Sequence, residues 1–386
     1  MEAAVEAADL GVGIIGAGWM GHVHARAYAR LPHHYPELGV RPRLVAVADP
    51  VPGQLDDFAA RFGPVRRYDA WRALLADPEV RAVSVTAPNA LHREIGTAVA
   101  EAGRDLWIEK PVGLTAGDAR AVADAVARAG VRAAVGFNYR TFPAVARARA
   151  LLREGAIGTP THARCQLLTD YAAHPMAPLN WRFTREHGGS GVLGDLASHG
   201  VDLVRFLLGD LAAVVAETAV FTPRRPLPSA ADTSHYAVAA ADAATGPVEN
   251  ADYVCALLRT AAGVPVTFEA SRAAVGEQNA YGFSVHGTRG LLAWDFRRPG
   301  ELAVSRGDSY LNQPVTRWTA APGDGDYGRF HPGAGNAMSY DDSKVAEAAD
   351  FLSPDRSPAT PADAVAAAET LEALTTSAAS GAWVAL

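Results

Sequence analysis

The sequence predicts an α/β protein: an N-terminal Rossmann domain, followed by an α+β domain with a large, mostly antiparallel open sheet. Three observations predict this. The chain has 386 residues, which at about 150 residues per domain implies two domains, one of them large. Up to residue 140, short apolar runs alternate with helical patterns, as in βαβ units. Beyond residue 143, most apolar runs are separated by turn signals, as in antiparallel hairpins.

The first domain is assigned to residues 1–140. Its parallel strands are expected at residues 11–15, 44–48, 82–86, 105–108 and 133–137. Its helices are expected where apolar residues recur every three or four positions, at 19–29, 54–62, 71–76, 90–102 and 116–129. Residues 31–43 are interpreted as an insertion, containing Pro and His, before the second strand.

The second domain is assigned to residues 141–386 and is expected to bind substrate and form oligomers. A helix to residue 154, a strand at 162–168 and one long helix at 191–208 are expected first, then strands at 212–221, 251–260, 264–271, 281–286, 291–296 and 301–305. Two stretches rich in Pro, Gly, Ala and Asp, 222–249 and 317–337, are long for loops and are expected to be mobile or to act as lids. The closing helices, at 339–352 and 361–379, are the elements that would pack back on the first domain.

Composition narrows the classes of partner and compartment. The 35 Lys and Arg residues against 42 Asp and Glu give a formal net charge of −7, and like charges do not cluster, which disfavours nucleic acid and anionic membrane. Only Cys165 and Cys255 are present, so neither a disulfide framework nor a cysteine metal site is indicated. The first residues are acidic, unlike a signal peptide. We expect a cytoplasmic protein.

A phosphate-binding turn follows the first strand. The strand leads into Gly16-Ala17-Gly18-Trp19-Met20-Gly21 and then a helical pattern, which is the context that a G-x-G-x-x-G match requires. Gly16 would make the tight turn, Gly18 would let the backbone approach a pyrophosphate, and Gly21 would let helix and strand pack closely. The turn therefore predicts a dinucleotide site.

Asp49 predicts which dinucleotide is bound. It ends the second predicted strand, where a carboxylate accepts hydrogen bonds from ribose hydroxyls and repels a 2′-phosphate. NAD is therefore expected in preference to NADP.

Two further segments carry groups suited to proton transfer. Glu109, Lys110 and Pro111 follow a predicted strand at the sheet edge where open α/β sheets bind ligands. Asp195 and His199 are four residues apart on one predicted helix, so a carboxylate–imidazole pair can form on one face. The chain has 33 Arg but only two Lys, Lys110 and Lys344. A lysine at position 110 therefore suggests a titratable ammonium, since arginine stays charged.

Together these motifs resemble the Gfo/Idh/MocA family, the glucose-fructose oxidoreductase and inositol dehydrogenase group, over nearly the whole chain. The motifs that carry the resemblance are the glycine turn, Thr86-Ala87-Pro88-Asn89 with His92, Glu109-Lys110-Pro111, Gly136-Phe137-Asn138-Tyr139-Arg140, Trp181-Arg182 and the Asp195/His199 helix. Within the family, the segments at 137–145, 180–183 and 340–344 are most similar to inositol and levoglucosan dehydrogenases.

The resemblance implies roles for individual residues. Lys110, Asp195 and His199 would form the catalytic group, and a cis peptide would precede Pro111. The cofactor contacts would be Gly16, Gly18, Trp19, Met20, Gly21, Asp49, Thr86, Asn89, His92, Glu109, Lys110, Arg140, Trp181 and Arg182. A homodimer or homotetramer is also implied.

The expected reaction is oxidation of a secondary hydroxyl of a sugar, anhydrosugar or cyclitol to the ketone. His199 would take the hydroxyl proton, Lys110 would steady the alkoxide, and no metal is needed. Substrate contacts are expected from Lys110, Asp195, His199, Tyr139 and His331, and further candidates for hydrogen bonds or stacking are Asp170, His174, Trp181, Asn336 and Tyr340. His331 lies in a stretch, 325–335, that could fold over the substrate as a lid.

Other functions share these motifs. A keto-sugar reductase would run the reaction backwards, an NAD-containing glycosidase would use a transient oxidation, and a dinucleotide sensor would bind NAD without turnover. Tyr340 and Lys344 have the Tyr-x-x-x-Lys spacing of short-chain dehydrogenases, but they lie far beyond the predicted parallel sheet. We interpret this pair as helix surface or pocket wall.

Overall fold

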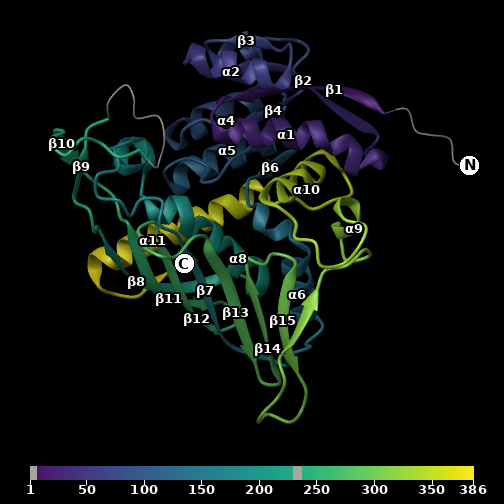
Figure 1. Cartoon of the computed structure of the whole chain (residues 1–386), viewed down its shortest axis with the longest axis vertical. Helices are drawn as coiled ribbons and strands as arrows, with labels where there is room; N and C mark the ends of the chain where they lie inside the picture. Colours follow the sequence, from purple (N-terminus) through teal and green to yellow (C-terminus); the bar gives the residue numbers. More distant parts are fainter. Residues whose placement is uncertain (1–6, 229–236) are drawn as a thin grey trace, which may run out of the picture. The chain divides into compact units, whose positions relative to one another are not determined.

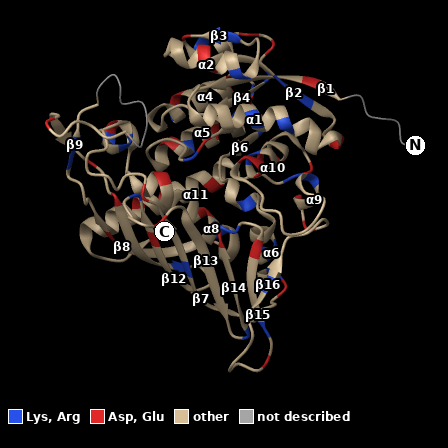
Figure 2. Cartoon of the chain, viewed as in Figure 1, with Lys and Arg blue, Asp and Glu red and all other residues tan. Residues whose placement is uncertain are grey.

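The computed structural model describes residues 7–228 and 237–386 and divides into two compact units. The first contains the chain up to Thr141 together with Asp326–Pro332 and Met338–Val365. The second contains Phe142–Gly325, Gly333–Ala337 and Ala366–Leu386. Acidic and basic residues are interspersed over the elements of both units (Figure 2).

The first unit is built on a six-stranded sheet of order β3-β2-β1-β4-β5-β6 in which every pair is parallel. This is the strand order of a dinucleotide-binding Rossmann fold, so the predicted fold class is confirmed. The strands are β1 (Ala8–Ile15), β2 (Val40–Ala48), β3 (Arg66–Tyr68), β4 (Ala82–Val85), β5 (Asp105–Ile108) and β6 (Ala133–Val135). Its first helices are α1 (Trp19–His34), α2 (Pro52–Phe62), α3 (Trp71–Leu75), α4 (His92–Glu101) and α5 (Ala116–Ala129).

The predicted insertion at 31–43 is wrong. Helix α1 continues through Pro32 to His34, and β2 already begins at Val40. Proline removes one helical hydrogen bond and usually disrupts a helix. Here Leu31 and Tyr35 on either side of it are buried, so packing against the core holds the last turn of the helix.

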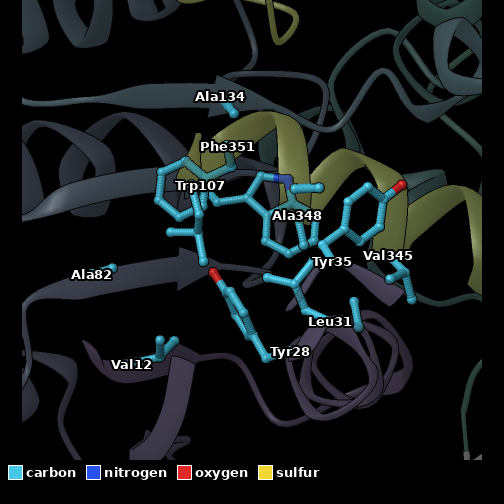
Figure 3. Close-up of a cluster of buried hydrophobic side chains, with 13 residues drawn as sticks. Val12, Tyr28, Leu31, Tyr35, Ala82, Trp107, Ala134, Val345, Ala348 and Phe351 are labelled. Carbon is cyan, nitrogen blue, oxygen red and sulfur yellow. The ribbon is translucent and has the colours of Figure 1, made fainter. Parts of the chain in front are cut away.

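Helix α10 (Tyr340–Leu352), from near the end of the chain, packs against α1 within the first unit (Figure 1). Its Val345, Ala348 and Phe351 join a buried cluster with Trp107 of β5 and Tyr28 of α1 (Figure 3). Burying a Phe or Val side chain contributes about 1.5–3 kcal/mol. The helix begins at a capping box in which Ser339 and Asp342 bond each other's backbone N–H groups.

The second unit is built on a nine-stranded sheet of order β16-β15-β14-β13-β7-β12-β11-β8-β17. All of its pairs are antiparallel except β7 with β12, which confirms the large, mostly antiparallel sheet. The strands are β7 (Pro160–Leu168), β8 (Leu211–Ala219), β11 (Tyr253–Thr260), β12 (Pro265–Ser271), β13 (Ala280–Gly287), β14 (Gly290–Asp295), β15 (Glu301–Arg306), β16 (Thr316–Thr319) and β17 (Val384–Ala385).

Helix α8 (Ser198–Leu208) lies against this sheet (Figure 1). A Cβ added at Gly200 would stand 2.3 Å from Leu167 of β7 and 2.6 Å from Phe268 of β12, so only glycine allows the helix to come this close. The other helices are α6 (Pro143–Arg153), α7 (Arg185–Gly188), α9 (Tyr327–Phe330) and α11 (Pro361–Ser380).

The two long stretches expected as mobile segments or lids contain regular structure. Strands β9 (Arg224–Pro226) and β10 (Thr245–Pro247) pair in the first stretch, and the second contains most of β16 and all of α9. Residues 229–236 of the first stretch lie outside the described residues. Within the described ranges, no helix has the length and apolarity needed to cross a membrane.

Candidate active site

The glycine turn joins β1 to α1 with close backbone contacts. Gly16 has φ 98°, and a Cβ there would stand 2.7 Å from the backbone of Thr86 and Ala87. A Cβ at Gly21 would stand 2.1 Å from the carbonyl oxygen of Gly16. At Gly18, which caps α1, a Cβ would meet nothing within 4 Å. The turn therefore combines tight packing with one glycine facing open space at a helix N-terminus, an arrangement that fits a pyrophosphate.

Asp49 fixes this turn to the end of β2. Its Oδ2 accepts a hydrogen bond from the backbone N–H of Ala17 at 2.9 Å, and its Oδ1 accepts one from Val51 at 2.9 Å. An ionised carboxylate has about four lone-pair sites, so both oxygens retain capacity for the ribose hydroxyls of a dinucleotide.

Tyr340 lies beside the glycine turn. Its ring stacks on Trp19 with centroids 5.7 Å apart, and its hydroxyl lies 3.9 Å from Sδ of Met20. Trp19 is nevertheless 66% exposed. Tyr340, a candidate substrate contact from the sequence, thus contacts two residues predicted to bind the cofactor.

His92 links the ends of two neighbouring strands. Its Nδ1 lies 2.7 Å from the carbonyl oxygen of Pro111, and its Nε2 lies 2.7 Å from that of Ala87. Burial lowers the pKa of this imidazole, although both backbone contacts favour the cation. His92 thereby fixes the segment after β4 to the segment that follows Lys110.

Glu109 is the centre of a buried polar cluster in the first unit. Its Oε1 lies 2.5 Å from Nζ of Lys344 and 3.0 Å from Nε2 of His24. Lys344 also contacts Oε2 of Glu347 at 2.7 Å. Behind His24, Nδ1 lies 3.0 Å from the hydroxyl of Ser84. Since Lys344 is fully buried, the interpretation of this lysine as helix surface is wrong.

The pKa values in this cluster assign its charges. Burial lowers the pKa of His24 to about 4, so the imidazole is neutral and donates from Nε2 to Glu109. Burial opposes ionisation of Glu109, but the charge of Lys344 and the bond from His24 outweigh it and hold this carboxyl's pKa well below its usual range. Burial raises the pKa of Glu347 to about 8 despite Lys344. The cluster thus combines one ammonium and one carboxylate with a second carboxyl whose pKa is raised.

Lys110 follows Glu109 at the end of β5. Its backbone N–H donates to Oε2 of Glu109 at 3.3 Å, and the Lys110–Pro111 peptide is cis, as the resemblance implies. A Cβ at Gly136 would stand 2.6 Å from the Glu109 carboxylate, so glycine makes room for it. The backbone of Lys110 is therefore held by a carboxylate that is itself anchored by Lys344.

Asp195 lies in a π-helical turn of the second unit. The long helix predicted at 191–208 is confirmed from Val192 onward, but Leu193–Ala197 forms a π-helical turn within it and α8 begins at Ser198. Gly191, with φ 67°, precedes the turn, and a Cβ there would stand 2.6 Å from the carbonyl oxygen of Ala251. π-Helical turns are rare in proteins, and those that occur often lie at functional sites. His199 follows in the first turn of α8 and is 7% exposed.

Tyr171 contacts a predicted catalytic residue and was not among the residues predicted from the sequence. Its hydroxyl donates to Oδ2 of Asp195 at 2.5 Å. Burial and the charge of Asp195 raise the pKa of this phenol well above its ordinary value, so it remains a donor. Its position could have indicated a role, because Tyr171 follows β7 on the segment that contains the candidate residues Asp170 and His174.

Arg182 and Trp181 lie in the short helix after Asn180. The Arg182 guanidinium stacks on the Trp181 ring at 4.3 Å, and the Arg182 carbonyl accepts from Asn250 at 2.9 Å and from Arg272 at 3.2 Å. These contacts belong to the second unit and fix the backbone of two predicted cofactor contacts.

Further predicted residues have contacts or burial within their own units. Arg140 pairs with Asp363 at 3.1 Å, Tyr139 is buried, and the His331 ring lies 5.3 Å from that of Tyr327. His174 Nδ1 accepts from the backbone of Met176. Over the described residues, no three His, Cys, Asp or Glu side chains are placed to hold a metal ion.

The predicted site residues are thus divided between the two units. Those in the first unit are Gly16, Gly18, Trp19, Met20, Gly21, Asp49, Thr86, Asn89, His92, Glu109, Lys110, Tyr139, Arg140 and His331. Those in the second unit are Trp181, Arg182, Asp195 and His199.

A parallel sheet of this order, with a glycine turn after β1 and a carboxylate after β2, defines a dinucleotide-binding protein. Comparison with known families agrees. Residues 10–137 match the model of the oxidoreductase family with an NAD-binding Rossmann fold, and residues 145–293 match that of the GFO/IDH/MocA C-terminal domain. The chain belongs to the Gfo/Idh/MocA family.

Two curated relatives match most of the chain. Levoglucosan dehydrogenase of Pseudarthrobacter phenanthrenivorans is 36% identical over 89% of this chain and 88% of its own length. Inositol 2-dehydrogenase of Rhizobium meliloti is 30% identical over 80% and 84%. A solved structure of levoglucosan dehydrogenase in complex with NADH and levoglucosan has a TM-score of 0.89 and 34% identity, covering 98% of this chain and 99% of that one. The chain is therefore an NAD-dependent oxidoreductase that acts on CH–OH groups of sugar-type donors.

Proposed function

We propose that the protein oxidises a secondary ring hydroxyl of an anhydrosugar or cyclitol to the ketone, with levoglucosan as the first substrate to test. The observation that carries the proposal is the similarity to levoglucosan dehydrogenase over nearly the full length of both chains. NAD⁺ supplies the hydride acceptor.

The first unit would hold the cofactor. The helix N-terminus at Gly18 would face the pyrophosphate, and Asp49 would accept from the adenosine ribose. Trp19 and Met20, supported by Tyr340, would cover the same turn. Thr86, Asn89, His92, Glu109, Arg140, Trp181 and Arg182 are proposed to complete the dinucleotide site.

Lys110 would act at the reacting oxygen. Its backbone is held by Glu109, which fixes the point from which the side chain extends. An ammonium at that oxygen stabilises developing negative charge and can exchange a proton, which a guanidinium cannot.

Asp195 and His199 are proposed as the other members of the catalytic group. The imidazole would take the hydroxyl proton as hydride leaves, and the carboxylate would orient the imidazole and stabilise its cation. Tyr139 and His331 are proposed to contact other hydroxyls of the substrate.

The test is formation of NADH, followed by its near-ultraviolet absorbance, from NAD⁺ or NADP⁺ with levoglucosan, inositols and aldoses. Turnover of levoglucosan or a cyclitol with preference for NAD⁺ is expected. Preference for NADP⁺ would contradict the role of Asp49. Bound NAD without turnover of any compound would contradict the proposed reaction and favour the glycosidase, the reductase or the sensor.

We further propose a cytoplasmic homodimer or homotetramer. The support is that both cysteines, Cys165 and Cys255, are free thiols, which fits a reducing compartment, and that an open antiparallel sheet offers a face for a second copy. Light scattering of the purified protein measures the assembly directly.

A further inference from the structure

The Tyr171–Asp195 contact points to a function for a residue outside the predicted catalytic group. Tyr171 lies beyond the end of β7, whereas Asp195 lies in the π-helical turn, 24 positions away in sequence. At 2.5 Å their hydrogen bond is in the range of a charge-assisted O–H···O⁻ bond. This contact is contained within the second unit.

The segment that carries Tyr171 is fixed by two buried arginines. Arg225 donates to the carbonyl oxygens of Ala172 and His174. The backbone carbonyl of Arg272 accepts from the N–H of Ala172 at 2.9 Å. Both guanidinium groups are fully buried, and they lie 4.3 and 4.5 Å from the ring of Phe183. The phenol is thus presented to Asp195 from a rigid support.

Arg272 is itself held by charged and polar partners. Arg272 pairs with Asp252 at 2.8 Å, with both side chains fully buried, and also donates to Oδ1 of Asn250 at 2.8 Å. Buried charges of this kind persist only where they are paired and bonded. These contacts hold the backbone beside Tyr171, whose hydroxyl donates to the carboxylate of Asp195.

We infer that Tyr171 is a positioning residue, which fixes the orientation and ionised state of Asp195 so that this carboxylate can orient His199. The inference rests on the proposed function. A phenol O–H that donates to Oδ2 restricts rotation of the carboxylate and leaves its other oxygen to serve the imidazole. The bond also favours the carboxylate over the acid, because only the charged form accepts it fully.

The substitution Tyr171→Phe removes the hydroxyl and keeps the ring. We expect kcat with levoglucosan, or with the substrate found in the panel, to fall about tenfold, since about 1.4 kcal/mol corresponds to tenfold in rate. KM for NAD⁺ is expected to stay within about twofold, and the acid limb of the kcat profile to move to higher pH. The charged groups around this hydroxyl are Asp195, Arg182 and Arg272, with His199 following on α8.

The matched control is Tyr68→Phe. Tyr68 also donates to a carboxylate, Oδ2 of Asp77, at 3.0 Å, but it lies on the edge strand β3 of the first unit. This variant is expected to keep the wild-type kcat and pH profile. An equal fall in kcat for both variants would show a general effect on folding and would overturn the inference.

A second background separates this inference from the proposed function. In an Asp195→Asn enzyme the carboxylate that Tyr171 serves is gone, so adding Tyr171→Phe is expected to change residual kcat by less than about twofold. A further tenfold loss there would overturn the positioning role. If Asp195→Asn alone retained full turnover, the proposed function of Asp195 would fail. If it were inactive while Tyr171→Phe matched wild type in kcat and pH profile, only the present inference would fail.

Discussion

The two units bury charge in different ways. The first buries a lysine, Lys344, between two carboxyl groups, one whose pKa is lowered and one whose pKa is raised. The second buries two arginines, Arg225 and Arg272, mainly against backbone carbonyls, and Asp252 pairs with Arg272. The first cluster adjoins a proposed catalytic residue, since Glu109 precedes Lys110. The second supports the segment of Tyr171, the proposed positioning residue.

The difference follows from the shapes of the two cations. An ammonium is a compact charge with three donors, so its stability depends on the carboxyls beside it. A guanidinium is a planar fork with five donors that can satisfy several carbonyls at once. The carboxyl groups around Lys344 can therefore gain or lose a proton. The two arginines keep their charge, and Arg225 holds the backbone carbonyl groups beside Tyr171 in place.

The substitution Lys344→Met should have the largest effect on stability. It leaves Glu109 and Glu347 buried without a cation, and breaking a buried pair in this way costs about 3–5 kcal/mol. Urea unfolding of the purified protein measures the loss. Adding Glu109→Gln to Lys344→Met should recover part of it, because the uncompensated charge is then gone. No recovery would show that packing by the lysine stem, rather than its charge, accounts for the loss.

The substitution Asp252→Asn should cost less, about 1.5–3 kcal/mol, the range for a hydrogen bond to a charged group. Arg272 keeps Asn250 and the Arg182 carbonyl as acceptors, so its charge stays solvated by dipoles. The same urea titration, run beside Lys344→Met, gives the comparison. A loss equal to or larger than that of Lys344→Met would contradict the distinction between the two clusters.

The substitution Glu347→Gln should have the smallest effect near pH 6 and should change how stability depends on pH. The folded-state pKa of Glu347 is raised from 4.5 to about 8, so the folded protein holds this proton more tightly than the unfolded chain. Its contribution is fully present below about pH 4.5 and is lost as the pH rises toward 8. Glutamine has no proton to lose. Unfolding at pH 6 and pH 9 should therefore show a smaller decline for the variant than for wild type, and parallel declines would contradict the protonated state of Glu347.

Local signals in the sequence predicted the first unit well. Strand β5 and helix α5 lie at the predicted residues. Helix α5 has a capping box of Thr115 and Asp118 at its start and a left-handed Gly130 at its end, and both signals are readable from neighbouring residues. Strand β3 was missed because Arg66–Tyr68 has no apolar run and is formed by pairing with β2 alone.

The rest depends on contacts that are distant in sequence. Glu109 and Lys344 are separated by 235 positions, so no local pattern could pair them or bury the lysine. The π-helical turn at Asp195 arises where the backbone around Gly191 packs against Ala251, which helical periodicity does not reveal. Tyr171 was missed for the same reason, since its partner lies on another element. The residue types of the proposed catalytic group could be identified from the sequence, but the contacts that hold these residues in place could not.

The central claim is that Lys110 and His199 act together in one reaction. The most direct measurement is kcat for Lys110→Arg, His199→Ala and the double variant, with NADH binding measured by fluorescence as a control. Each single change should lower kcat by about 10²–10⁴-fold, the usual contribution of a positioned proton-transfer group. The double variant should be little slower than the slower single variant, since residues that act as a unit are not additive. Losses that multiply, or a single variant that retains wild-type kcat, would contradict the claim.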